Sequence, residues 1–375
     1  MARRLKVIHI CDKFGNQGST THGLARSFSW WMPRFDTQRF DVKLYAVKQR
    51  DAASRAAEEM GLDIRYLGNR GANPSALISF LSMIKAEKPD ILHLHGWIAA
   101  NYGRIAGRMT GVPTIMNEHG VSDVYPMNQK IADMMLSRFT DTALAVSEAG
   151  ALFLTDSRRV DPTKVRVLYQ GIPVADFQPV HPAVVVEEKQ RLGIPAENPV
   201  IGTIARMDVQ KGVTYILQAI PRVLDSFPDA RFLIVGDGPE LPKLKAEASD
   251  LDIGGSVVFT GYRSDIPCVQ SIMDVQVIAS LWEAASLTVF EAMSMGRALI
   301  ATKVGGLNEI LQDGCQALMI PPADAQALGK AVVRILKDPE LAASLRENGI
   351  ATSRKYDVAH VVRNMEALYE EICAR

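Results

Sequence analysis

The sequence predicts an α/β protein built from two doubly wound domains, each with a parallel sheet. Short apolar runs rich in valine and isoleucine alternate with segments of helical period along nearly all of the 375 residues. Such alternation is typical of parallel sheets that are covered by helices on both faces. It occurs in two series, and 375 residues exceed what one hydrophobic core usually serves. We therefore expect two domains.

The expected strands are short and bounded by turn residues. Those of the first series are residues 6–10, 41–47, 63–67, 90–95, 113–117, 142–146 and 165–169. Those of the second series are residues 199–205, 231–236, 256–261, 274–280 and 298–302. The segments between them carry apolar residues at helical spacing, as in 76–84.

A proline-rich stretch separates the two series. Its prolines are Pro173, Pro179, Pro182, Pro195 and Pro199. Because proline interrupts regular structure, we place the first domain at 1–178 and the second at 179–356. A helix over 184–192 fits inside the stretch. An amphipathic helix within 357–375 is expected to pack back on the first domain.

Composition and charge exclude several classes of protein. Lysine plus arginine and aspartate plus glutamate are each 42, so the net charge gives no reason to expect a nucleic-acid partner. The four cysteines are far apart, which suits a reducing compartment. No run approaches the roughly 18 apolar residues of a membrane span, and the apolar run Val7–Cys11 is too short for a signal peptide. We expect a cytoplasmic protein without a cofactor.

In doubly wound sheets, ligands bind beyond the carboxyl ends of the strands. The first strand is followed by Gly15 and Gly18, shortly before a helix. Glycines allow backbone N–H groups to approach a phosphate, and a helix start adds a favourable dipole. The spacing matches neither the dinucleotide fingerprint nor the Walker loop. A phosphate contact and an ordinary tight turn both fit this loop.

In the second series, Arg206 and Lys211 lie in a short loop between a strand and a helix. Two such cations can converge on a pyrophosphate and neutralise its charge as a leaving group departs. Solvated surface cations are the alternative. Gly236 begins a Gly-Asp-Gly-Pro turn at the end of the next strand.

The segment 280–310 is the most informative part of the sequence. Glu283 is placed in a loop, and Ser286 is a suitable N-cap for a helix over 287–295. The free N–H groups at such a helix start can bind phosphate. Glu291, inside the same helix, can accept hydrogen bonds from sugar hydroxyls.

Here the sequence resembles a known family. Two glutamates with seven residues between them, followed by A-M-x-x-G-x-x-x-I-A-T-x-V-G-G-x-x-E-I, are similar to the signature of glycosyltransferase family four. The motifs R-M-x-x-x-K-G, G-D-G-P, the S-E after 142–146 and the G-I-x-x-x-x-F at 171–177 stand in the family's order. The resemblance spans nearly the whole chain. It implies a GT-B fold, in which two Rossmann-like domains face each other across a cleft.

The resemblance also implies an activity. The family contains retaining, metal-independent glycosyltransferases that move a hexose from a nucleoside-diphosphate sugar to an acceptor hydroxyl. A UDP-sugar donor is favoured. The acceptor would be a sugar or a lipid-linked sugar, in polysaccharide, glycolipid or glycoconjugate synthesis. The alternatives are a nucleotide-sugar 2-epimerase of the same fold and a non-catalytic nucleotide-sugar-binding protein.

Roles follow from the resemblance for the residues that match. Arg206 and Lys211 should bind the donor diphosphate, Glu291 the ribose, and Glu283 the donor sugar. His119, in Asn-Glu-His-Gly, matches the active-site histidine of the family. The further donor contacts implied are Gly15 or Gly18, Gly236, the base near Tyr262 and Arg263, and the amides of Ser286, Leu287 and Thr288.

The chain departs from the family pattern at two places. Ala284-Ala285-Ser286 replaces the usual Gly-Phe-Gly, and alanine does not adopt positive φ as freely as glycine. This change is the feature that favours a non-catalytic binding protein. Gln170 replaces the asparagine that is common before Gly171.

Two further groups of residues have open interpretations. His93 and His95 alternate on one strand, but no third ligand is placed nearby in sequence, so we expect no metal site. The aromatic residues Trp30, Trp31 and Phe35 either contact a membrane surface or pack at the end of the first helix.

Overall fold

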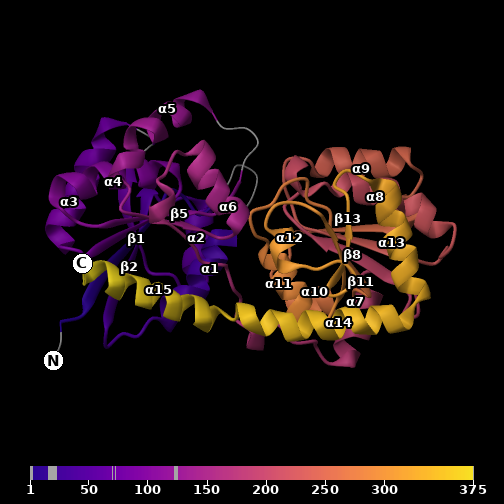
Figure 1. Cartoon of the computed structure of the whole chain (residues 1–375). Helices are drawn as coiled ribbons and strands as arrows, with labels where there is room; N and C mark the ends of the chain where they lie inside the picture. The colour runs from indigo at the N-terminus through magenta and orange to yellow at the C-terminus, as the bar shows by residue number, and fades with distance from the viewer. Residues whose placement is uncertain (1–2, 16–22, 70, 72, 122–125, 375) are drawn as a thin grey trace. The chain divides into compact units, whose positions relative to one another are not determined.

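The computed structural model describes residues 3–15, 23–69, 71, 73–121 and 126–374. The chain divides into two compact units, of which the first joins Met1–Gly171 to Val358–Arg375 and the second spans Ile172–Asp357 (Figure 1). The sequence placed the boundary after residue 178. The units divide earlier, after Gly171, so the proline-rich stretch belongs to the second unit.

The first unit has a seven-stranded parallel sheet in the order β3-β2-β1-β4-β5-β6-β7. Its strands are β1 Leu5–Cys11, β2 Phe40–Lys48, β3 Ile64–Asn69, β4 Ile91–His95, β5 Thr114–Glu118, β6 Thr142–Ala145 and β7 Val165–Val167. All seven runs expected in the first half are strands. The strand order reverses at β1, which lies between β2 and β4.

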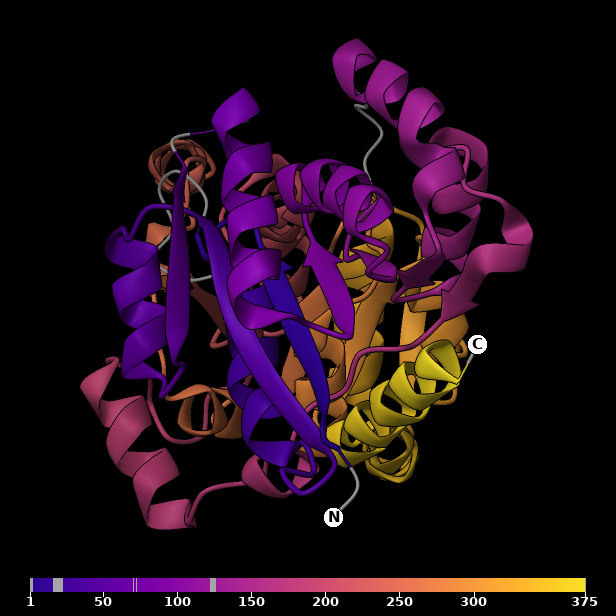
Figure 2. The same cartoon turned by 90° about the vertical axis from the view of Figure 1, so that its left-hand side faces the viewer.

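Helices cover both faces of this sheet (Figure 2). They are α1 Gly23–Trp31, α2 Ala52–Glu59, α3 Pro74–Glu87, α4 Trp97–Thr110, α5 Met127–Leu136, α6 Glu148–Leu152 and α15 Val358–Cys373. Alternate residues of a strand point to opposite faces. Val7 and Cys11 accordingly pack with α1, α2 and α15, while Ile8 and Ile10 pack with α3 and α4.

The C-terminal helix α15 belongs to the core of the first unit, although it is the last element of the chain. Figure 1 shows it in yellow beside the strands of that unit. Val361, Met365 and Tyr369 are buried on its inner face. The carboxylate of Glu366 accepts the backbone N–H of Asp36 at 2.7 Å. The helix therefore contributes buried side chains to the first sheet.

The second unit has a six-stranded parallel sheet in the order β10-β9-β8-β11-β12-β13. Its strands are β8 Val200–Ile204, β9 Arg231–Val235, β10 Val257–Gly261, β11 Val275–Ile278, β12 Ala298–Thr302 and β13 Ala317–Ile320. The sequence predicted only the first five. The sixth is a four-residue run with a single β-branched side chain, and it becomes a strand by pairing with β12. Tertiary context decides such a short run.

The second sheet is also packed on both sides by helices. They are α7 Pro182–Arg191, α8 Val213–Leu224, α9 Leu241–Asp250, α10 Ile266–Ser271, α11 Leu287–Ser294, α12 Leu307–Ile310, α13 Ala325–Lys337 and α14 Pro339–Ser353. In β9, Phe232 and Ile234 belong to one hydrophobic cluster, and Leu233 and Val235 to the other. This strand is thus buried on both faces, as parallel sheets require.

The aromatic group near the end of α1 is part of the core. Trp31 and Phe35 are only 3% and 5% exposed. The packing interpretation therefore fits Trp31 and Phe35. Trp30 is half-buried, and contact of this group with a membrane surface stays a prediction. Four of the exposed apolar side chains lie on α5, at Met127, Ile131, Met134 and Met135. Among the described residues, no helix is long and apolar enough to cross a bilayer.

Candidate functional site

The second sheet reverses its strand order at β8, which lies between β9 and β11. In doubly wound folds, the loops at such a point bind the ligand. Lys211 follows β8, at the end of a short helical turn over Val209–Lys211. Its Nζ lies 2.5 Å from Oε2 of Glu283, which follows β11. Ser280 Oγ donates to the same carboxylate oxygen at 3.1 Å. The fold thus brings together two of the predicted residues.

Further hydrogen bonds join the same two loops. The side-chain amide of Gln210 donates to the carbonyl of Trp282 at 3.0 Å. The N–H of Leu281 donates to the carbonyl of Gln210 at 2.7 Å. Sequence reasoning did not identify Gln210 or Ser280. Only the adjacency of β8 and β11, which are far apart in the chain, gives these two side chains their supporting role.

Arg206 lies in the same loop as Lys211, and its guanidinium contacts the carboxylate of Asp208. The Asp208 side chain also accepts the backbone N–H of Lys211 at 3.3 Å and so holds the turn. The side chains of Arg206 and Lys211 stay 33% and 21% exposed. Both cations therefore have a carboxylate partner and a face that an anion can reach.

Two glycines allow these loops to pack closely. Gly236 has φ +133°, and a Cβ at this position would lie 1.8 Å from the carbonyl oxygen of Ala205. Gly305 has φ +38°, and its Cβ would lie 2.0 Å from the carbonyl oxygen of Glu283. Any side chain would displace backbone at both positions. Gly236 thus allows the close approach to the loop after β8, and Gly305 allows the close approach to the backbone of Glu283.

Helix α11 begins beside Glu283. Ser286 is its N-cap residue, as predicted, but its side chain makes no capping hydrogen bond. The amides of Leu287 and Thr288 are the first of the helix. Glu291, one turn further along, is fully buried.

The Ala284-Ala285-Ser286 replacement fits an ordinary backbone. The non-glycine residues with positive φ among those described are Lys88, Arg159, Asp252 and Ala323. Ala284 and Ala285 are not among them. The loop therefore does not need glycine at these positions, and the replacement brings no backbone strain.

The predicted base-binding residues follow β10, at the edge of the sheet. The guanidinium of Arg263 contacts Glu188 of α7 at 2.8 Å and also binds Asp265. These hydrogen bonds to carboxylates raise the pKa of Arg263. The side chain of Tyr262 is exposed. Arg263 is thus held by two acids, while Tyr262 is accessible.

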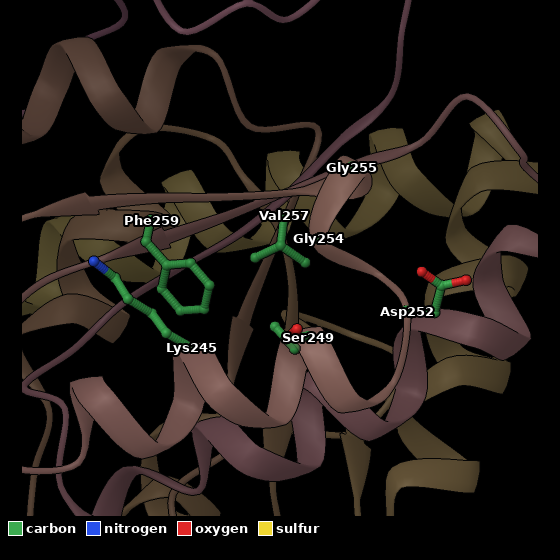
Figure 3. A pocket seen from close by; sticks show the side chains of 8 residues that line it. Lys245, Ser249, Asp252, Gly254, Gly255, Val257 and Phe259 are labelled. Atoms are coloured by element: carbon green, nitrogen blue, oxygen red, sulfur yellow. The ribbon is translucent and has the colours of Figure 1, made fainter.

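A hollow of about 330 Å³ lies elsewhere on the second unit (Figure 3). Lys245 and Ser249 of α9 line it, together with Gly254, Gly255 and Val257. Its glycines precede β10, whereas Tyr262 and Arg263 follow that strand. The hollow is therefore at the amino end of the strand and separate from the candidate site.

In the first unit, Gly15 follows β1 and is buried, while Gly18 lies outside the described residues. Asp12, in the same loop, accepts the N–H groups of Ile98 at 2.9 Å and Ala99 at 2.6 Å. It therefore caps α4, whose own N-cap residue Gly96 has no side chain. Burial raises the pKa of Asp12 to about 6.

His119 follows β5 and lies beside a cluster of buried histidines, while it is itself only partly buried. Its Nε2 is 2.8 Å from Nδ1 of His95, and its Nδ1 is 3.2 Å from Nε2 of Gln170. Burial lowers the pKa of His119 to about 4. Sequence reasoning identified His93, His95 and His119 but missed His9, although the alternation in β1 places it on the same face as Val7 and Cys11.

The ligand atoms of His9, His93 and His95 lie within 4.8 Å of one another. His9 is therefore the third nitrogen that was missing from the sequence pattern. In the structure these nitrogens take part in hydrogen bonds. Nδ1 of His9 is 3.0 Å from Nε2 of His95, and Nε2 of His93 is 3.1 Å from Oδ1 of Asn117.

Comparison with known proteins agrees with this architecture. Residues 185–352 match the family described as "Glycosyl transferases group 1", and residues 23–176 match "Glycosyltransferase Family 4". The structure is similar to that of HepE from Anabaena in complex with UDP, with a TM-score of 0.85 and 19% sequence identity. The similarity covers 98% of this chain and 100% of the HepE chain. The fold is therefore GT-B.

Relatives of known activity are also glycosyltransferases. An Escherichia coli UDP-Gal:alpha-D-GlcNAc-diphosphoundecaprenol alpha-1,3-galactosyltransferase is 28% identical over 71% of this chain and 71% of its own. A 2-deoxystreptamine glucosyltransferase from Streptomyces kanamyceticus is 27% identical over 91% of each chain. The chain belongs to the group 1 glycosyltransferases, of the family-four type, and is a glycosyltransferase that uses a nucleotide-sugar donor. These relatives give no support to the epimerase alternative.

Proposed function

We propose that this glycosyltransferase moves a hexose from a UDP-sugar to an acceptor hydroxyl, with retention of configuration and without a metal ion. The observation that carries the proposal is the ion pair of Lys211 with Glu283 at the strand-order reversal of the second sheet, with Arg206 in the same loop as Lys211. The E. coli relative uses UDP-Gal, and HepE was solved with UDP and with UDP-glucose. Both favour uridine in the donor.

The donor diphosphate is assigned to Arg206, Lys211 and the first amides of α11, at Ser286, Leu287 and Thr288. Two guanidinium or ammonium groups and a helix start offset phosphate charge in a site of lowered dielectric. Asp208 and Glu283 form ion pairs with these cations. Positioned cations of this kind need little reorganisation when the ligand arrives.

The rest of the donor is assigned to the other residues that match the family pattern. Glu283 accepts hydroxyl groups of the transferred sugar, and Glu291 holds the ribose. The remaining donor contacts are assigned to Gly15, Gly236, Tyr262 and Arg263. The base is placed beside Tyr262. His119 is the residue of the first unit assigned to the reaction.

The chemistry needs charge stabilisation more than an acid–base pair. As the bond from the sugar to the nucleoside diphosphate breaks, Arg206 and Lys211 neutralise the charge that develops on the leaving group. The acceptor hydroxyl attacks from the side of the leaving group, and a donor phosphate oxygen takes its proton. This route gives retention without the paired carboxylates of a glycosidase. The acceptor is a sugar or a lipid-linked sugar, as in the E. coli relative.

The proposal is tested by incubating the protein with UDP-glucose, UDP-galactose and UDP-N-acetylglucosamine, each with and without EDTA. A bound donor stabilises the fold by mass action, so one of them should raise the melting temperature. The same donor should release UDP, slowly to water and faster once an acceptor is found. EDTA should change neither result. Binding without any release of UDP would instead support the non-catalytic alternative, and activity restored only by Mg²⁺ or Mn²⁺ would contradict the metal-free mechanism.

A further inference from the structure

The buried histidines of the first unit belong to one continuous chain of hydrogen bonds, which we call the histidine relay. From His119, the relay runs to Nδ1 of His95 at 2.8 Å, and from Nε2 of His95 to Nδ1 of His9 at 3.0 Å. It then passes from Nε2 of His9 to the hydroxyl of Tyr369, at 3.0 Å. Tyr369 lies on α15, so the relay connects the loop after β5 to the C-terminal helix.

The relay continues beyond Tyr369 and has a polar group at each end. The Tyr369 hydroxyl is 2.8 Å from Nδ1 of His93, and Nε2 of His93 is 3.1 Å from Oδ1 of Asn117. At the other end, the side-chain amide of Gln170 meets Nδ1 of His119. Every ring nitrogen of the four histidines therefore takes part in a hydrogen bond.

Strand register explains why these side chains meet. His9 of β1 is paired with His93 of β4, and His95 is paired with Asn117 of β5. Residues two apart share a face of the sheet, so the side chains fall on the side that α15 covers. His9, His93 and His95 are fully buried. A buried polar group is costly unless it is hydrogen-bonded, and the relay meets that need.

The bonding pattern assigns the protons. Burial lowers the pKa of His93 to about 3 and that of His119 to about 4, and it also lowers the pKa values of His9 and His95 well below their ordinary value. Each ring is thus neutral, with one N–H donor and one acceptor nitrogen. Asn117 Oδ1 accepts, so His93 carries its proton on Nε2 and accepts from Tyr369. Tyr369 then accepts from Nε2 of His9, His9 accepts on Nδ1 from Nε2 of His95, and His95 accepts on Nδ1 from Nε2 of His119. Every histidine therefore carries its proton on Nε2, and the side-chain amide of Gln170 donates to Nδ1 of His119.

We propose that the histidine relay fixes His119 in a single neutral tautomer and that Tyr369 is a positioning residue for the transfer reaction. The inference rests on the role proposed for His119. With Nε2 donating to His95 and Nδ1 accepting from Gln170, the ring can neither turn nor take up a proton without breaking one of these two partly buried hydrogen bonds. His119 then acts as a fixed, uncharged element, which agrees with a mechanism in which the donor phosphate receives the proton.

Tyr369→Phe is the variant that tests the relay, because it removes one oxygen and keeps the buried ring. His9 loses its hydrogen-bond acceptor and His93 loses its donor. The hydrogen bonds from His9 to His119 can then run in either direction, so these rings are no longer held in one tautomer. Tyr45→Phe is the matched control: Tyr45 is also buried in the first unit, and its hydroxyl meets Glu87 at 2.8 Å, outside the relay. Nitrogen-15 NMR of labelled histidine reads the tautomers in the full chain near pH 7.

In the unmodified protein, all four histidines should be neutral with the proton on Nε2. Tyr369→Phe should give mixed tautomers at His9 and His119, and kcat should fall by about 10-fold, a part of what misplacing a reacting group costs. Its affinity for UDP should stay unchanged. Tyr45→Phe should alter none of these. A role in stability alone would lower the melting temperature and leave the His119 signal and kcat as they were, which would overturn the proposal.

Two measurements on the unmodified protein remain decisive even if Tyr369→Phe does not fold. Mixed or charged tautomers among the four histidines would show that the relay is not continuous. Shifts of the His9, His93 and His95 nitrogens on addition of zinc chloride would identify a metal site and overturn the assignment. Absence of any transfer from UDP-sugars would contradict the proposed function and leave the tautomer result standing.

Discussion

At the scale of single residues, the candidate donor site depends on two cations that already have carboxylate partners. Lys211 binds Glu283, and Arg206 binds Asp208. The sequence predicted three of these four residues, because their motif spacing is local to two short segments. Asp208 was not singled out. Its role comes from the turn that it closes onto the N–H of Lys211.

Loss of either cation should reduce turnover strongly. We expect Arg206→Ala and Lys211→Ala each to lower kcat by about 10²–10³, on the scale of losing one group that stabilises developing charge. Lys243→Ala is a suitable control, since Lys243 is an exposed lysine of α9 in the same unit. Steady-state kinetics with the donor in excess measures the effect. Near-normal turnover in both variants would contradict the assignment of the donor diphosphate to this loop.

At the scale of elements, parallel strands and their loops were the most predictable feature. Twelve expected runs are strands because their apolar patterns suit strands buried on both faces. The strand β13 was missed because its four residues carry little pattern of their own. The contacts between loops were also beyond the sequence. They depend on which strands are neighbours, and that is set by the folded sheet.

Packing between the loops after β8 and β9 should depend on Gly236. Gly236→Ala puts a Cβ onto the carbonyl of Ala205 at a positive φ, so we expect a loss of stability of about 1–3 kcal/mol together with weaker UDP binding. Gly254→Ala is the control, because nothing lies within 4 Å of its Cβ. Urea unfolding and calorimetry measure the two effects. Equal behaviour of both variants would contradict this account of the loop.

The histidines of β1 and β4, together with His119 after β5, should make the first unit sensitive to acid. Burial lowers the pKa of His93 to about 3 and of His119 to about 4, from 6.5. A lowered pKa contributes stability that is present above pH 6.5 and is lost as the pH falls toward the folded value, by up to about 1.4 kcal/mol per pH unit for each group. The contribution of Asp12 to stability changes with pH in the opposite direction. Its pKa is raised to about 6, so the folded state gains stability relative to the unfolded state as the pH falls through that value.

The histidines outnumber Asp12, so the urea midpoint should fall between pH 6.5 and pH 4.5. In Asp12→Asn, the opposing contribution is absent, and the fall over the same range should be steeper. Circular dichroism at each pH gives both midpoints. A midpoint that rises toward pH 4.5 in the unmodified protein would mean that the histidines are not held neutral.

At the scale of the whole molecule, two doubly wound units with the C-terminal helix in the first define the fold. The sequence predicted this architecture because strand–helix alternation and family motifs extend over nearly the whole chain. It did not predict Tyr369 as a partner of His9. That contact joins residues at opposite ends of the sequence, and no local pattern encodes it.

The central claim is that the second unit holds a nucleotide sugar, with Glu291 on the nucleotide and Glu283 on the sugar. Titration calorimetry of UDP against the unmodified protein, Glu291→Ala and Glu283→Ala tests it most directly. Glu291→Ala should weaken UDP binding by about 1.5–3 kcal/mol, the worth of hydrogen bonds to a charged group. Glu283→Ala should leave UDP affinity nearly unchanged, because Glu283 is assigned to the sugar and the positive charge of Lys211 is retained for the diphosphate, while transfer falls. Equal losses in the two variants, or a larger loss for Glu283→Ala, would contradict this placement of the donor.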